Sequence, residues 1–230
     1  MRLVPTRIAE PVDTMKKLVW KILKPLYQII RPTFTFNNEK YPYFWHEYNM
    51  TWRGERAVEI PIMRKIVEQA AGKKILEVGN VLSHYFLFPH DIVDKYEKAP
   101  GVNNEDVVTY RPHSEPYDLI LCISTLEHVG WDEEPKDPEK FFKAFENLIG
   151  PCLKLGGKLV VTLPLGHNQV LDQAVAEKKI AFSQMHYLKR VRRVNGWEES
   201  DLEAVRNSRE MDPYPFANAL FIGVFVKPNR

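Results

Sequence analysis

Short apolar runs alternate with helical patterns from Glu55 to the end of the chain. A helical pattern over Val58, Ile62 and Ile66 ends at Gly72 and is followed at once by an apolar run at 75–78. Similar runs lie at 91–94, 106–108, 119–123, 159–163 and 219–226, and a further helical segment lies at 138–149. This alternation is typical of crossover units, which build a mostly parallel sheet with helices on both faces. We expect ligands at the carboxyl ends of its strands.

The amino-terminal quarter has a different pattern. Residues 12–31 place apolar side chains at helical spacing and lysines opposite them, which predicts an amphipathic helix bent at Pro25. Such a helix packs on its own domain, makes peripheral contact with a membrane, or forms a dimer contact. Residues 32–52 are crowded with aromatic side chains without a period, which predicts either a lid over a pocket or plain packing of the arm. We therefore divide the chain into an amino-terminal helix and aromatic cap, 1–52, and a main domain, 53–230.

Composition and charge narrow the function classes. With 230 residues, 44 % of them hydrophobic, the chain can bury a substantial core and is not disordered throughout. The formal net charge of +2 predicts no nucleic-acid partner, and we interpret the short basic run at 189–193 as a solvated face. Two cysteines, Cys122 and Cys152, are too few for a disulfide framework and favour a reducing, cytoplasmic setting. No apolar stretch is long enough to predict a transmembrane helix.

Five segments of the main domain follow one another in an order that is informative about its family. They are Lys-Ile-Leu-Glu-Val-Gly at 74–79, Asp-Ile-Val-Asp at 91–94, Glu-Asp at 105–106, the run at 117–128 that ends in Leu-Glu-His, and the turn and strand at 153–161. Together they resemble the class I S-adenosylmethionine-dependent methyltransferases. The resemblance implies a Rossmann-like α/β methyltransferase sandwich with a mostly parallel seven-stranded sheet. It also implies S-adenosyl-L-methionine as the cofactor and methyl transfer as the activity.

The resemblance carries cofactor-binding roles over to six residues, which are Glu77, Gly79, Asn80, Asp94, Asp106 and Ser124. The residue types also make chemical sense by themselves. A glycine directly after a buried strand allows close approach of a ligand, and carboxylates at strand tips can accept hydrogen bonds from a ribose diol. A carboxylate inside the apolar run at 75–78 would be costly unless it had a partner. Asp91 and Glu97 remain alternatives to Asp94, and Glu105 remains an alternative to Asp106.

One departure from the family pattern matters. The family's glycine-rich loop often carries three glycines, whereas Gly79 is followed here by Asn-Val-Leu-Ser-His at 80–84. The missing glycines disfavour a nicotinamide dinucleotide enzyme, whose second glycine lets the backbone meet a pyrophosphate. They also keep open an alternative, a non-catalytic binding or scaffold protein with a degenerate methyltransferase fold.

Methyl transfer needs in-line positioning and, for a hydroxyl acceptor, a group that takes the proton. His128 follows the fourth strand on the expected ligand side and is our candidate catalytic base, with His84 and His167 as alternatives. No histidine and acid spacing compels a metal site, so the sequence predicts none. We expect O-methylation of a small molecule or of a glycan or lipid-linked acceptor.

Overall fold

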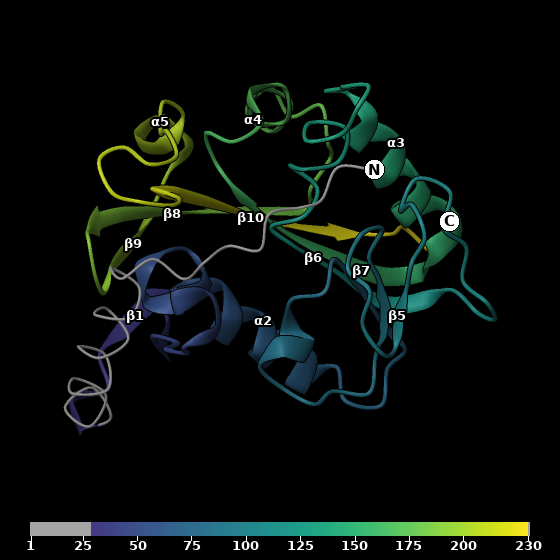
Figure 1. Ribbon diagram of the computed structural model, residues 1–230, viewed down its shortest axis with the longest axis horizontal. Coiled ribbons are helices and arrows are strands. Elements are labelled where there is room, and N and C mark those ends of the chain that lie inside the picture. Colours follow the sequence, from purple (N-terminus) through teal and green to yellow (C-terminus); the bar gives the residue numbers. More distant parts are fainter. Residues whose placement is uncertain (1–28, 230) are drawn as a thin grey trace, which may run out of the picture.

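The computed structural model describes residues 29–229 (Figure 1). Most of the predicted amphipathic helix, 12–28, therefore lies outside the described residues, and so does the proposed membrane contact. Within 29–229 no helix is long and apolar enough to cross a membrane.

An eight-stranded sheet runs through the molecule in the order β5-β4-β3-β6-β7-β10-β8-β9. Its strands are β3 (Ile75–Val78), β4 (Asp91–Val93), β5 (Val102–Asn103), β6 (Tyr117–Ile123), β7 (Leu153–Pro164), β8 (Gln184–Arg192), β9 (Gly196–Ser200) and β10 (Ala219–Val226). The five strands from β5 to β7 pair in parallel, whereas β10 is antiparallel to both β7 and β8, and β8 is antiparallel to β9. The predicted Rossmann-like α/β sandwich is confirmed, with one strand more than expected because β9 extends the sheet as the hairpin partner of β8.

Helices cover both faces of this sheet. The helices are α2 (Arg56–Gln69), α3 (Lys140–Asn147), α4 (Gln169–Ala176) and α5 (Leu202–Val205), with 3₁₀ segments η1 (Tyr48–Arg53) and η2 (Leu82–His84) and the π segment η3 (Leu148–Cys152). In Figure 1, α2 lies on one side of the sheet, while α3, α4 and α5 lie on the other. The residues that pair between β3 and β6 are buried on both faces of the sheet. This explains why the sequences of these strands are apolar runs and not alternating patterns.

Each face of the sheet has its own core. Leu76 of β3 and Ile120 of β6 belong to the core on the α3 side, whereas Ile75 and Leu121 belong to the core on the α2 side. Alternate residues of one strand point to opposite faces, so the two cores interleave along the same strands. This rigid middle layer fixes the carboxyl ends of β3, β4 and β6 relative to one another.

The aromatic stretch divides into two parts. Its first part forms the hairpin of β1 (Thr33–Phe36) and β2 (Glu39–Pro42), whose aromatic rings Phe34 and Tyr41 are buried in the α2-side core with Trp197 of β9. Its second part includes Tyr48 of η1, which remains 42 % exposed and stacks on His84 with ring centroids 4.3 Å apart. The arm is thus mainly core packing, and only its second part lies over the loop that follows β3.

One prediction about local structure is wrong, and a second holds only in part. Residues 106–108 form a turn, because the Asp106 carboxylate accepts a hydrogen bond from the Val108 N–H and its carbonyl accepts one from Tyr110 N–H; the strand lies earlier, at β5. The run 189–193 is not wholly solvated either. Arg190 is buried, and its guanidinium donates to the carbonyl oxygens of Pro215 and Ala217.

Candidate functional site

A cavity of about 470 Å³ opens at the carboxyl ends of β3, β4 and β6. It is lined by Val78, Gly79, Asn80, Val81, Val93, Asp94, Lys95, Tyr96, Glu97, Glu105, Asp106, Val107, Ser124, Thr125, His128, Val129 and Glu133. Six of the seven residues predicted for the site therefore meet here, and Glu77 is the exception. A parallel sheet explains the convergence, since its loops leave from one edge.

Gly79 brings two loops close together. Its φ is +83°, and its N–H donates to the Val93 carbonyl of β4 at 2.9 Å. A Cβ at this position would lie 2.3 Å from Thr125 Oγ1, in the loop after β6. Both the left-handed backbone and the contact with Thr125 require glycine here. One glycine is thus enough to bring the loop after β3 against the loop after β6.

Glu77 supports the loop that follows β3 and does not line the cavity. Its Oε1 accepts hydrogen bonds from the N–H groups of Val81 and Leu82 at 2.9 and 2.8 Å, and its Oε2 lies 2.7 Å from His90 Nε2. Burial opposes the charge on His90, but the hydrogen bond and the charge of Glu77 raise its pKa above the usual value. The buried acid predicted to need a partner has three, and they belong to the protein itself.

Asp94 and Asn80 lie next to each other in the wall of the cavity. Asp94 Oδ1 accepts from the N–H groups of Tyr96 and Glu97 at 2.8 Å, while Oδ2 makes only a long contact of 3.3 Å with the Asn80 N–H. The Asn80 amide donates to Glu97 Oε1 at 2.7 Å. One Asp94 oxygen therefore shapes its own turn, and the other retains capacity to accept a hydrogen bond from a ligand.

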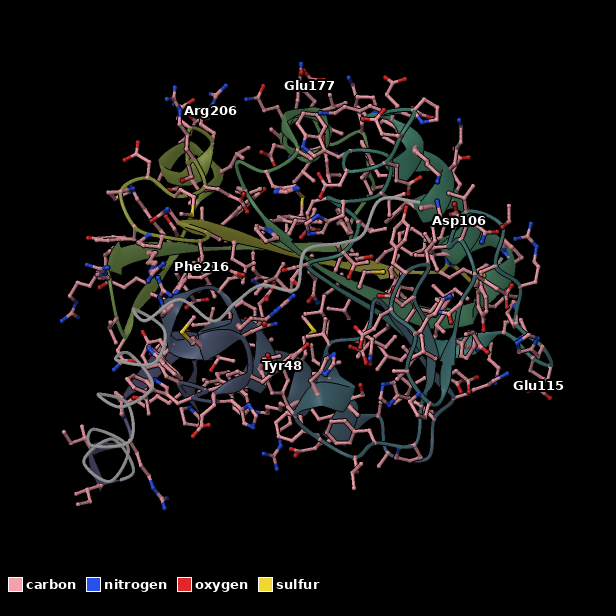
Figure 2. The ribbon with its side chains drawn as sticks, viewed as in Figure 1. Tyr48, Asp106, Glu115, Glu177, Arg206 and Phe216 are labelled. Atoms are coloured by element: carbon pink, nitrogen blue, oxygen red, sulfur yellow. The ribbon has the colours of Figure 1, made fainter. Side chains whose placement is uncertain are left out.

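Asp106 lies within a charged network on the α3 side of the cavity. Its Oδ2 is 2.8 Å from Lys140 Nζ and 3.0 Å from Lys95 Nζ, and both lysines also contact Glu133. Burial opposes ionisation of Asp106, but hydrogen bonds from Lys140, the Val108 N–H and Lys95 lower its pKa to about 2. The carboxylate is therefore ionised at neutral pH. Figure 2 shows Asp106 on the α3 side of the sheet and Tyr48 on the α2 side.

Ser124 ties the end of β6 to α2. Its backbone is left-handed, with φ of +42°, and its Oγ donates to Glu59 Oε1 at 2.5 Å. Glu59 is fully buried and forms a 2.5 Å ion pair with Arg56. The Ser124 hydroxyl thus has a protein partner, while the residue itself lines the cavity beside Thr125.

His128 stands at the outer edge of the cavity with half of its side chain exposed. Its Nδ1 lies 2.5 Å from Asp132 Oδ2, and its ring centroid lies 4.5 Å from that of His167. His167 follows β7, so two candidate bases from different strands come together. The third, His84, lies instead beside Tyr48 and 3.0 Å from Glu97.

Several residues of the cavity wall were not predicted from the sequence. Lys95 and Tyr96 follow Asp94 directly, Thr125 follows Ser124, and Glu133 lies in the loop after β6. Lys95, Tyr96 and Thr125 could have been found from the sequence, because each lies within two residues of a predicted site residue. No sequence signal marked Glu133, because only the fold brings it to Lys95 and Lys140.

No family model matches the chain, and no curated protein matches it. Among solved structures, it is similar to a methyltransferase from Thermotoga maritima described as a possible histamine N-methyltransferase, with TM-score 0.44, 13 % identity and coverage of 89 % of this chain and 99 % of that one. It is also similar to N-methyltransferase NodS from Bradyrhizobium japonicum WM9 in complex with S-adenosyl-L-homocysteine, with TM-score 0.40, 12 % identity and coverage of 76 % and 91 %. A third structure, the sugar N-methyltransferase KedS8 from a Streptoalloteichus species, has TM-score 0.38, 13 % identity and coverage of 80 % and 94 %.

Proposed function

We propose that this protein is an S-adenosyl-L-methionine-dependent methyltransferase that binds its cofactor in the cavity at the ends of β3, β4 and β6. The convergence of six residues, singled out from separate sequence motifs, on one cavity carries the proposal. A strand, a sharp glycine turn and a carboxylate at the tip of the next strand suit a nucleoside ligand. The cofactor, when bound, supplies an electrophilic methyl group on a sulfonium.

The side chains divide the binding work between them. Asp94 Oδ2 would accept hydrogen bonds from the ribose diol, and Asn80 would present its backbone beside it. Asp106, ionised and held by Lys95 and Lys140, would accept from the adenine amino group. Gly79 and Ser124 bring the loops after β3 and β6 to the cofactor. Glu77 acts indirectly, because it holds the loop after β3 and does not line the cavity.

The acceptor side is assigned to His128, and we propose a hydroxyl oxygen of a small molecule or glycan as the acceptor. A hydrogen bond from Nδ1–H to Asp132 places the proton of neutral His128 on Nδ1 and leaves the Nε2 lone pair able to take a proton. Nε2 would take the proton that the acceptor hydroxyl loses on methylation, and the cofactor would be left as S-adenosyl-L-homocysteine. Asp132 would then stabilise the charged imidazole.

Cofactor binding is tested first by calorimetric titration with S-adenosyl-L-homocysteine. We expect Asp94→Asn to weaken binding by about tenfold to a hundredfold, because a hydrogen bond to a charged group contributes about 1.5–3 kcal/mol. Asp118→Asn is the matched control, since Asp118 also accepts from a backbone N–H, that of Lys74, but does not line this cavity. Equal affinity of the two variants would refute the ribose role. Failure of the unmutated protein to bind the sulfur nucleotide would favour the scaffold alternative.

Proton transfer is tested by His128→Ala. With tritiated S-adenosyl-L-methionine and an acceptor selected from a panel of glycans and hydroxylated small molecules, we expect kcat to fall by about a hundredfold or more. Affinity for S-adenosyl-L-homocysteine should change far less, because the loss concerns the acceptor step. His113→Ala serves as the control, since His113 is exposed and lies outside the cavity. Full turnover of the His128 variant would show that another group takes the proton.

A further inference from the structure

A cluster of two histidines and one aspartate lies beside the cavity. His128 and Asp132 come from the loop after β6, and His167 comes from the loop after β7. Each residue offers one ligand atom, and these atoms all lie within 4.8 Å of one another. Asp132 Oδ2 is central, at 2.5 Å from His128 Nδ1 and 3.4 Å from His167 Nε2.

The second nitrogen of each histidine faces a glutamate. His167 Nδ1 lies 3.1 Å from Glu210 Oε2, and His128 Nε2 lies 3.7 Å from Glu127 Oε1. Histidines that bind metals usually direct their other ring nitrogen to a carboxylate or carbonyl, which orients the ring and makes the ligating nitrogen more basic. His167 has this arrangement with Glu210, whereas His128 Nε2 lies beyond hydrogen-bond distance of Glu127.

The polar groups around the cluster are short of partners within the described residues. His167 Nε2 is buried and has no hydrogen bond of good geometry there, and the same holds for both carboxylate oxygens of Glu127. Glu127 as a whole is 1 % exposed. Buried polar atoms without partners are costly, so they commonly mark places where a ligand or ion supplies the missing interaction.

The backbone holds the three residues in place. The Asp132 N–H donates to the His128 carbonyl at 3.1 Å. On the other loop, Gly166 adopts φ of +98° and donates its N–H to Asp172 at 2.8 Å, and Asn168 caps α4 through the N–H groups of Val170 and Leu171. His167 is thereby fixed between two anchored residues, as a metal ligand requires.

We propose that His128, Asp132 and His167 bind a divalent transition-metal ion, with Glu210 orienting His167 through its second ring nitrogen. Two imidazoles and one carboxylate suit Zn²⁺, Co²⁺ or Fe²⁺, whereas Mg²⁺ and Ca²⁺ prefer oxygen ligands throughout. Three protein ligands leave further coordination positions for water or a ligand. The site stands independently of the proposed function, and only its effect on methyl transfer rests on that function. An ion bound at Nδ1 would place the His128 proton on Nε2, so His128 could act as base only in the metal-free enzyme.

The test uses the full-length protein, freed of any affinity tag and dialysed against chelator, with Co²⁺ as the probe. We expect a visible absorption band that saturates at one equivalent and is removed by Zn²⁺. His167→Ala should lower the Co²⁺ affinity by at least about tenfold, and Glu210→Gln by about tenfold to a hundredfold. His113→Ala, an exposed histidine 4.0 Å from Glu105, should bind as the unmutated protein does.

Two outcomes would overturn the proposal. One is the absence of saturable Co²⁺ binding, and the other is equal affinity in the His167→Ala and His113→Ala variants. Titration of the same preparations with S-adenosyl-L-homocysteine separates this result from the proposed function. Nucleotide binding without Co²⁺ binding rejects only the metal site, and Co²⁺ binding without nucleotide binding rejects only the cofactor assignment.

Discussion

Replacement of Glu77 by alanine is expected to lower the free energy of unfolding by about 3–5 kcal/mol, the usual cost of removing one partner of a buried ion pair. Glu77 and His90 have side chains that are 0 % and 3 % exposed and lie 2.7 Å apart. The substitution would leave His90 without its carboxylate. It would also leave the N–H groups of Val81 and Leu82 without their acceptor.

Chemical denaturation of the Glu77→Ala variant measures this loss through the midpoint and slope of the unfolding curve. Glu97→Ala is the comparison, because Glu97 also pairs with a histidine, His84, at 3.0 Å but in a more exposed setting, 35 % for Glu97. More exposed pairs contribute about 0–1 kcal/mol, so this variant should stay near the unmutated protein. Similar losses in both variants would show that Glu77 has no special role in holding the loop.

Replacement of Gly79 by alanine is expected to be the most damaging change to the cavity. The backbone there is left-handed, which costs an alanine about 1–2 kcal/mol, and the added Cβ would collide with Thr125. Thr125 and Gly79 both line the cavity. The loops after β3 and β6 would therefore have to separate to make room for the alanine side chain. We expect S-adenosyl-L-homocysteine binding to fall by more than tenfold and unfolding to occur at lower denaturant concentration.

Gly72 offers a matched control for this effect. Its φ of +79° is nearly the same, but a Cβ added there meets no atom within 4 Å. Gly72→Ala therefore carries the backbone cost alone and should leave nucleotide affinity unchanged. The difference between the two variants measures the contact with Thr125. If both lose the same stability and neither loses affinity, close approach of the two loops has no part in binding.

The order of strands and helices could be predicted from the chain alone, because it depends on local periodicity. The apolar runs at 75–78 and 119–123 became β3 and β6, whose burial on both faces is what makes an unbroken apolar run. The same local argument failed at 106–108, where the Asp106 side chain competes with the strand by bonding the backbone of its own turn. It failed again at Arg190, which is buried and two of whose carbonyl partners, Pro215 and Ala217, lie more than twenty residues away.

The location of the candidate site also followed from the sequence, since strand tips of a parallel sheet meet at one edge. The role of each side chain did not. That Glu77 serves the loop, whereas Asp94 faces the cavity, depends on which backbone N–H groups the fold brings to each carboxylate. The cluster of His128, Asp132 and His167 joins two loops that are separated by β7 and α3. Periodicity is a property of neighbours along the chain, whereas hydrogen bonds and ligand sets are made by neighbours in space, and only tertiary packing decides those.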